Sequence, residues 1–264
     1  MAATNSGFVN INSDLGESFG PWVMGNDAEV LKIVKSANVA CGFHASDPTV
    51  MVDTVKLCQQ NGVSIGAHPG FADLQGFGRR VINLSIKELE ANIAYQIGAL
   101  QAIAALHGAK VTHMKPHGMM ANMSAESAEM SEAICRATKA VDRDLIFLAQ
   151  ANTEQGKAAR KAGLRVAEEV FADRTYGDNG LLTPRKEANS MIKDPARAVA
   201  NVRRMVDEQA IYSTSGKRIP CRVDSICVHG DGPTAVTVSK AVREGLEVAG
   251  IRIVPLTEMP NLKH

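Results

Sequence analysis

Side chains able to transfer protons follow several short apolar segments of this sequence. Asp14 and Glu17 come after the first such segment. His44 and His68 follow the second and third, and Lys115 ends the fourth. Carboxylates can act as general bases, and ammonium or imidazole groups can stabilise an oxyanion. If the apolar segments are parallel strands, this placement brings the five groups around one cavity, so they predict a catalytic site of hydrolytic type.

A second set of polar residues occupies positions suited to holding a substrate. His117 follows Lys115 in "MKPHG", and Arg174 lies in the polar segment "FADRTYGDNGLLTPR". His229 and Asp231 stand together in "CVHGDGP", before a predicted helix whose free N–H groups could hold a carboxylate or phosphate. Asp231 could equally cap that helix. We assign substrate binding to His117, Arg174, His229 and Asp231.

The segment around Arg174 is polar throughout and follows an apolar strand. It could bind an anion, act as a lid over the site, or be a solvated connection. Acidic and basic residues alternate along it, so its charge does not show which of these roles it has. Its polar residues include Glu169, Asp173, Arg174, Tyr176, Asp178 and Arg185.

Two other functions remain open from the residues alone. Asp14, His44 and His68 form the carboxylate-plus-two-imidazole combination that binds zinc or another divalent ion. The first alternative is therefore a divalent-metal-dependent hydrolase or deacetylase. The second is a non-catalytic subunit that only binds its ligand. A site that only binds a ligand usually needs fewer ionisable groups than this sequence places together, which makes the second alternative the weaker one.

The segments that position these residues have the length and composition of buried strands. Each is short, apolar and bounded by Gly, Asp or Pro, and they span residues 8–14, 37–43, 63–68, 111–115, 145–150, 164–171, 225–229 and 251–256. Helical patterns lie between most of them. In the clearest, Ser85 to Leu106, Ser85 and Glu88 predict a capping box. Strand and helix alternate seven or eight times, which indicates parallel βαβ units.

This alternation fits either a closed barrel or an open, doubly wound sheet. We favour an α/β fold with a (β/α) barrel of seven or eight parallel strands, because polar residues follow nearly every strand, whereas an open sheet concentrates its ligand at one switch point. Two β-prone runs within residues 211–223, around Ser215-Gly216, predict a small hairpin appended to the barrel. The chain length suits a single barrel domain over residues 1–264.

Charge and composition narrow the range of partners. The 29 basic residues nearly balance the 28 acidic ones, and no basic run is interleaved with aromatics, so we expect a small-molecule substrate and neither nucleic acid nor a membrane. The N-terminus lacks a secretory pattern, and we expect a cytoplasmic protein.

Five cysteines without a CxxC pair predict reduced thiols. No GxxxxGK[ST], GxGxxG, GxSxG or HExxH motif is present, so ATP chemistry would need another kind of site or another chain.

Six segments together carry a family resemblance that runs from about residue 8 to 256. They are "INSDLGES", "NVACGFHASDP", "GAHPGFADLQGFGRR", "MKPHG", "FADRTYGDNGLLTPR" and "ICVHGD". The chain resembles the LamB/YcsF family, the A subunits of prokaryotic ATP-dependent 5-oxoprolinase. It departs from the family at Met119 to Asn122, where "ALYN" is usual and Ala121 replaces an aromatic residue, and at Asn179 in "YGDNG".

The resemblance implies a barrel of the glycoside hydrolase/deacetylase type. It also implies cleavage of 5-oxo-L-proline to L-glutamate, coupled to hydrolysis of ATP to ADP and phosphate. The implied partners are the B and C subunits, with ATP as the co-substrate of the complex. On this hypothesis Asp14 or Glu17 activates water, Lys115 and a histidine stabilise the oxyanion, and Arg174 or the Gly230–Gly232 amides hold the substrate carboxylate.

Overall fold

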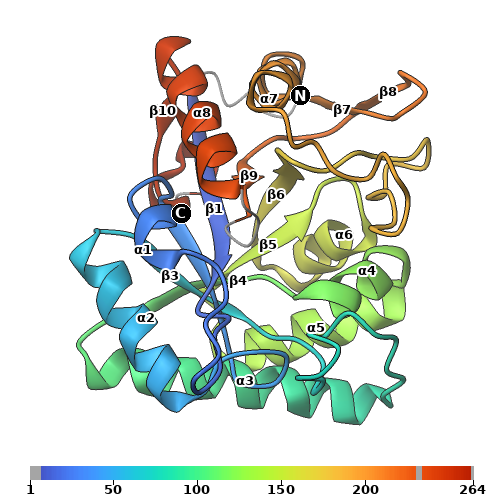
Figure 1. The fold of residues 1–264 in the computed structure, drawn as a ribbon. Coiled ribbons are helices and arrows are strands. Elements are labelled where there is room, and N and C mark those ends of the chain that lie inside the picture. Colours follow the sequence, from blue (N-terminus) through green and yellow to red (C-terminus); the bar gives the residue numbers. More distant parts are fainter. Residues whose placement is uncertain (1–6, 230–233, 263–264) are drawn as a thin grey trace.

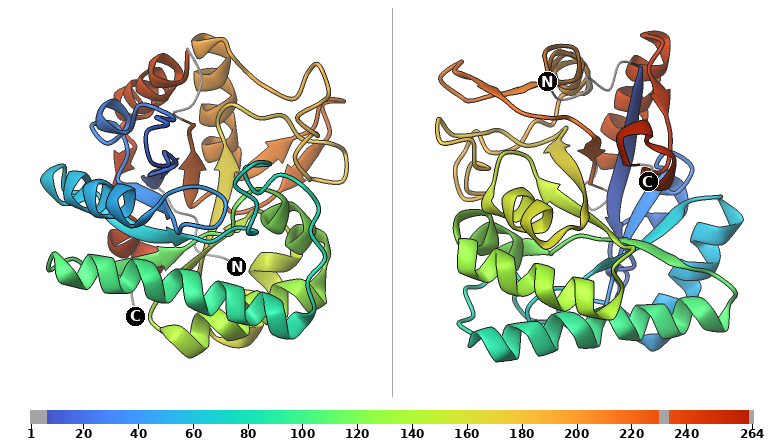
Figure 2. Two further views of the ribbon diagram at one scale, coloured as in Figure 1. Left: turned by 60° about the horizontal axis from the view of Figure 1, so that its bottom comes forward. Right: turned by 180° about the vertical axis from the view of Figure 1, so that it is seen from behind.

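The computed structural model describes residues 7–229 and 234–262, and in it seven parallel strands close into a barrel (Figures 1 and 2). They are β1 (Phe8–Leu15), β2 (Ser36–Ala40), β3 (Ser64–His68), β4 (Val111–Met114), β5 (Ile146–Gln150), β6 (Arg165–Phe171) and β9 (Ser225–Cys227). Pairing of β1 with both β2 and β9 closes the ring. The barrel prediction is therefore confirmed, and β9 is the strand that closes it.

The eighth predicted strand lies outside this ring. Only Arg252–Ile253 of the predicted segment forms a strand, β10, which pairs in parallel with Phe8 and Val9 at the start of β1. The predicted hairpin is confirmed, since β7 (Ala210–Tyr212) and β8 (Arg218–Pro220) pair in antiparallel fashion beside the barrel.

Helices surround the strands, and their ends follow from local sequence (Figure 1). Ser85 and Glu88 form the predicted capping box at the start of α3, and Asp194 caps α7 just before Pro195. The helices are α1 (Asp27–Val30), α2 (Pro48–Gln60), α3 (Ile86–Leu106), α4 (Gly118–Glu126), α5 (Ala128–Val141), α6 (Glu154–Ala162), α7 (Pro195–Glu208) and α8 (Ala235–Val248), with 3-10 turns η1 (Leu256–Glu258) and η2 (Pro260–Leu262).

Polar side chains fill part of the barrel interior and lead up to the strand ends. Asn38 donates to the amide oxygen of Asn12 at 2.7 Å and to Asp14 at 2.9 Å, while its own amide oxygen lies 3.2 Å from Nε2 of His113. Gly66 makes room for this imidazole, because a Cβ there would collide with it. Buried polar groups are costly unless hydrogen-bonded, so this network fixes the orientation of Asp14.

The five cysteines are free thiols, as predicted, and all but Cys221 are buried. Cys41 follows β2 inside the core, and burial raises the pKa of its thiol to about 12. A thiol with so high a pKa is a poor nucleophile, which supports a packing role. No helix in the described part of the chain is both long and apolar enough to cross a membrane.

Candidate active site at the barrel mouth

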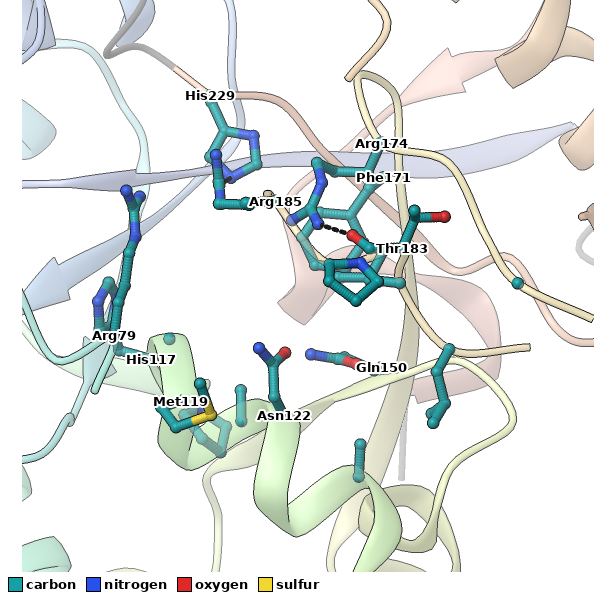
Figure 3. Close-up of a pocket in the computed structure, with 18 of the residues that line it drawn as sticks. Arg79, His117, Met119, Asn122, Gln150, Phe171, Arg174, Thr183, Arg185 and His229 are labelled. Carbon is teal, nitrogen blue, oxygen red and sulfur yellow. Dashed lines mark hydrogen bonds between the residues drawn. The ribbon is translucent and has the colours of Figure 1, made fainter. Parts of the chain in front are cut away.

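A cavity of about 870 Å³ opens at the carboxyl ends of the barrel strands, and part of its lining is shown in Figure 3. Its floor includes four of the five predicted catalytic residues: Asp14, Glu17, His68 and Lys115. Ligands of parallel barrels bind at this end because the loops and strand ends converge there. The floor consists of two groups of side chains with different electrostatics.

The lysine half consists of Asp14, Lys115 and Glu169. Lys115 Nζ donates to Oδ1 of Asp14 at 2.9 Å and lies 3.0 Å from Oε1 of Glu169. Nζ is also 3.4 Å from Sγ of Cys227, and 5.4 Å from the centre of the Phe171 ring. One buried ammonium thus stands between two carboxyl groups that come from β1 and β6.

Each charge in the lysine half sets the protonation of its neighbours. Burial disfavours the charged forms of Asp14 and Lys115, yet His68 and Lys115 together hold the pKa of Asp14 well below its usual value. The pKa of Lys115 is raised well above its usual value by Asp14, Cys227 and Glu169, against the effect of burial. Burial instead raises the pKa of Glu169. Asp14 and Lys115 are therefore an ion pair at neutral pH.

The histidine half consists of Glu17, His44, His68 and His117. The rings of His44 and His117 stack, with centroids 3.6 Å apart, and Nδ1 of His117 is 3.0 Å from Nε2 of His68. Oε1 of Glu17 lies 3.5 Å from Nε2 of His44 and 3.6 Å from Nδ1 of His117. His68 joins the two halves, since its Nε2 is 3.2 Å from Oδ2 of Asp14.

Burial dominates the protonation of the histidine half. It lowers the pKa of His44 and His117 well below the usual value, helped by neighbouring imidazoles, and it raises the pKa of Glu17. The two histidines are therefore neutral in the folded protein.

The outer wall of the cavity is rich in cationic groups (Figure 3). His229 lies 2.7 Å from Asp173 through Nδ1 and 3.3 Å from Arg185 through Nε2. Burial disfavours its charged form, but Asp173 raises its pKa above the usual value. Arg174 also lines the cavity, yet it donates to the backbone oxygens of Thr183 and Ser190 and so braces the long loop. This wall favours an anionic ligand.

The structure brings all five predicted catalytic residues together. His117, predicted to bind substrate, lies inside the histidine half, stacked on His44. Arg174 and His229 line the cavity as expected, and Asp231 lies outside the described residues. The structure also groups a different set of possible metal ligands from the predicted Asp14, His44 and His68: Glu17, His44, His68 and His117.

The sequence analysis counts Glu169 among the polar residues of the loop, although it falls inside the predicted strand 164–171, and the structure places it within β6, pointing at Lys115. A carboxylate inside a buried strand needs a charged or hydrogen-bonding partner. The position of Glu169 within an apolar strand could therefore have identified it as a site residue. Gln150 and Arg79 also line the cavity and were missed. Gln150 ends β5. Polar residues at the carboxyl ends of barrel strands are expected to face the site, so the same rule predicts Gln150 as a site residue. Both departures from the family pattern reach the cavity, as Met119, Ala121 and Asn179 are among its lining residues.

Fold and site together define a seven-stranded (β/α) barrel with a buried ionisable site at its carboxyl mouth. The chain belongs to the LamB/YcsF family, whose model matches residues 9–261. It is 51% identical over 248 residues to the A subunit of 5-oxoprolinase from Rhodopseudomonas palustris strain BisB18, covering 94% of this chain and 97% of that one.

Solved structures agree with this assignment. A lactam utilization protein from Thermus thermophilus superposes with a TM-score of 0.89 at 42% identity, covering 94% of this chain and all of that one. The catalytic domain of a peptidoglycan N-acetylglucosamine deacetylase from Eubacterium rectale has a TM-score of 0.52 at 13% identity, covering 97% of this chain and 91% of that one. The second likeness is one of fold alone.

Proposed function

We propose that this chain is the A subunit of an ATP-dependent 5-oxoprolinase, cleaving 5-oxo-L-proline to L-glutamate in the cytoplasm together with B and C subunits. The observation that carries the proposal is the buried Asp14–Lys115 pair at the floor of a cavity with a cationic wall. Two relatives, one named as the A subunit of 5-oxoprolinase and one as a lactam utilization protein, align over 94% of the chain and support the choice of substrate.

The lactam is an anion, and its carboxylate matches the outer wall of the cavity. Arg185 and His229 lie 3.3 Å apart on that wall, and the guanidinium of Arg174 is nearby. A carboxylate held there would direct the lactam ring toward the floor, where Lys115 is the cation that can face the carbonyl oxygen. The cavity, at about 870 Å³, also has room for a phosphoryl group on that oxygen.

Ring opening needs a nucleophilic water and a stabilised oxyanion. In our proposal Asp14, ionised at neutral pH, takes a proton from the water that attacks the carbonyl carbon. The Lys115 ammonium stabilises the negative charge that develops on oxygen. Asp14 then returns the proton to the leaving nitrogen, which yields the free amine of glutamate. ATP has a chemical role because transfer of its terminal phosphoryl group to the amide oxygen, with release of ADP, makes the carbon more electrophilic. Cleavage of the C–N bond then leaves an acyl phosphate, and a second water hydrolyses it to the side-chain carboxylate of glutamate and free phosphate.

Release of glutamate from 5-oxoproline by the purified chain with B and C subunits, with and without ATP, tests this proposal. We expect turnover only with ATP and all three subunits. Asp14→Asn should lower kcat by about 10²- to 10⁴-fold, because it removes the general base. Asp53→Asn, which changes an exposed aspartate on α2, is the matched control and should retain full activity. Full turnover by Asp14→Asn would refute the assigned role.

A metal-dependent hydrolase acting without ATP is the second candidate, favoured by the convergence of Glu17 and three histidines. The same assay separates the two, since this candidate predicts hydrolysis of an amide by the isolated chain with no ATP present. A third possibility, a non-catalytic carbohydrate- or lactam-binding subunit, predicts binding without turnover under every combination of subunits.

A further inference from the structure

We propose that Glu17, His44, His68 and His117 form a binding site for one divalent metal ion of the zinc or cobalt type. One ligand atom from each of these residues lies within 4.8 Å of the others. Imidazole nitrogens with a carboxylate oxygen are a donor set that such ions prefer. The proposal does not depend on the lactam assignment, since it concerns only what this cluster binds.

The hydrogen bonds of two histidines determine which of their nitrogens are free. Nδ1 of His68 lies 2.8 Å from the backbone oxygen of Lys115, and Nε2 of His117 lies 2.8 Å from the backbone oxygen of Phe77. A carbonyl oxygen only accepts, so both of these nitrogens carry hydrogen. In neutral rings, Nε2 of His68 and Nδ1 of His117 are then both lone-pair acceptors. Metal-binding histidines in proteins are commonly oriented by such a bond from the other nitrogen.

These two acceptor nitrogens nevertheless face each other at 3.0 Å. Two lone pairs cannot form a hydrogen bond, so a cation, either a proton or a metal ion, must lie between them. A proton on Nε2 of His68 would serve His117 and also Oδ2 of Asp14, which lies 3.2 Å away, but it would not reach Glu17 or His44. A metal ion would also engage neighbouring donors, so those donors distinguish the two cases.

The neighbouring donors lack hydrogen-bond partners within the described chain. Neither ring nitrogen of His44 has a hydrogen bond there, although the side chain is fully buried, and Oε1 of Glu17 also has none. Buried polar atoms are rarely left unsatisfied, and each one needs an explanation. A single metal ion would satisfy Oε1 of Glu17 and one ring nitrogen of His44 together, whereas a proton between His68 and His117 leaves both of these atoms without a hydrogen bond.

Three of the six separations between the donors are close to those around a tetrahedral ion, and all six are within 4.8 Å. Bonds of about 2.0–2.1 Å to zinc place neighbouring ligand atoms about 3.4 Å apart. The corresponding separations are 3.0 Å between His68 and His117, 3.5 Å between Glu17 and His44, and 3.6 Å between Glu17 and His117. An imidazole binds a metal in the plane of its ring, so we expect the ring of His44 to tilt away from its stacked position when the ion binds.

A neighbouring group of possible ligands, Asp14, Cys227 and His229, does not carry the same inference. Lys115 already lies there, with its ammonium 2.9 Å from Asp14 and 3.4 Å from Cys227. This positive charge satisfies the carboxylate and would repel a divalent ion. The metal site is therefore specific to the histidine half, from which His68 reaches Asp14 at 3.2 Å.

Metal binding by the isolated chain, without lactam, ATP or other subunits, is the decisive experiment. The protein is stripped with chelator, titrated with Co²⁺ while the visible d–d absorption is recorded, and then loaded with Zn²⁺ for metal analysis after desalting. We expect one equivalent of metal and the absorption spectrum of four-coordinate cobalt. Less than roughly a tenth of an equivalent of either ion would overturn the proposal, and would mean that a proton lies between His68 and His117.

Variants identify the ligands. Glu17→Gln and His44→Ala should each weaken Co²⁺ binding by roughly 10- to 100-fold, because the first replaces an anionic oxygen donor with a neutral one and the second removes a nitrogen donor. His107→Ala, at the C-terminal end of α3 and outside the cavity, is the matched control and should bind as the parent does. Glu17→Gln is nearly isosteric and should fold as the parent does. Circular dichroism would show whether His44→Ala also folds. Unchanged binding by a folded Glu17→Gln protein would overturn the proposed ligand set, whatever the activity toward lactams.

Discussion

The lysine half and the histidine half of the barrel floor bury ionisable groups in two different ways. In the lysine half, the chain supplies its own counter-ion, since Lys115 stands between Asp14 and Glu169. In the histidine half, donor atoms converge with hydrogen bonds that leave lone pairs facing each other. Polar residues that converge at a barrel mouth can therefore form more than one kind of site. The position of the single ammonium group of Lys115 determines which half has room for another cation.

Removing that ammonium should have the largest effect. Lys115→Met leaves Asp14 and Glu169 buried without their cation, and breaking a buried pair on one side typically costs about 3–5 kcal/mol. If our proposed mechanism holds, it should also lower kcat by about 10²- to 10³-fold, since the oxyanion loses its cation. Guanidinium unfolding and the glutamate-release assay measure the two effects.

Lys240→Met is the matched control for this prediction. Lys240 lies on α8, is 68% exposed, and its ammonium is 3.9 Å from Glu244, so the free energy of unfolding should change by about 0.5 kcal/mol or less. Equal stability of the Lys115→Met and Lys240→Met proteins would show that the lysine half is not held by its central charge.

The strand ends were the part of this site that the sequence could predict. Short apolar runs bounded by Gly, Asp or Pro located every barrel strand, and because parallel strands present their carboxyl ends on one face, Asp14, His44, His68 and Lys115 could be expected to meet. That rule depends only on chain direction and needs no knowledge of which strands are neighbours.

The pairing of residues across the floor could not be predicted in this way. Glu169 of β6 meets Lys115, which follows β4, across the closed ring, and the sequence pattern, which fits seven or eight strands, does not determine which strand ends face each other. The stacking of His117 on His44 depends on the direction of the chain after Pro116, where α4 begins. Tautomers of the histidines likewise depend on backbone oxygens of distant loops, such as that of Phe77.

An added methyl group at Gly70 should disturb the histidine half selectively. A Cβ at this position would lie 2.6 Å from Nδ1 of His44, so the imidazole must move. Overpacking of this kind costs about 1–3 kcal/mol. We expect Gly70→Ala to lose that much stability in guanidinium unfolding. Gly98→Ala, in α3 with open space around it, should instead gain about 0.5–1 kcal/mol. If both variants behaved alike, close packing around His44 would be refuted.

The smallest effect concerns His113, a buried imidazole in the barrel interior whose hydrogen bonds within residues 7–229 and 234–262 go to neutral groups, Asn38 and Thr112. Burial, aided by the charge of Lys115, lowers its pKa to about 3. In the unfolded chain its pKa is near 6.5, so between pH 6.5 and 3 only the unfolded state takes up this proton, and stability falls as the pH falls. The contribution is at most about 1.4 kcal/mol per pH unit. Guanidinium unfolding at pH 7, 6 and 5 measures this effect. The free energy of unfolding should depend less on pH for His113→Gln than for the parent or for the control variant His107→Gln. Equal slopes would mean that His113 is protonated in the folded barrel despite its uncharged surroundings.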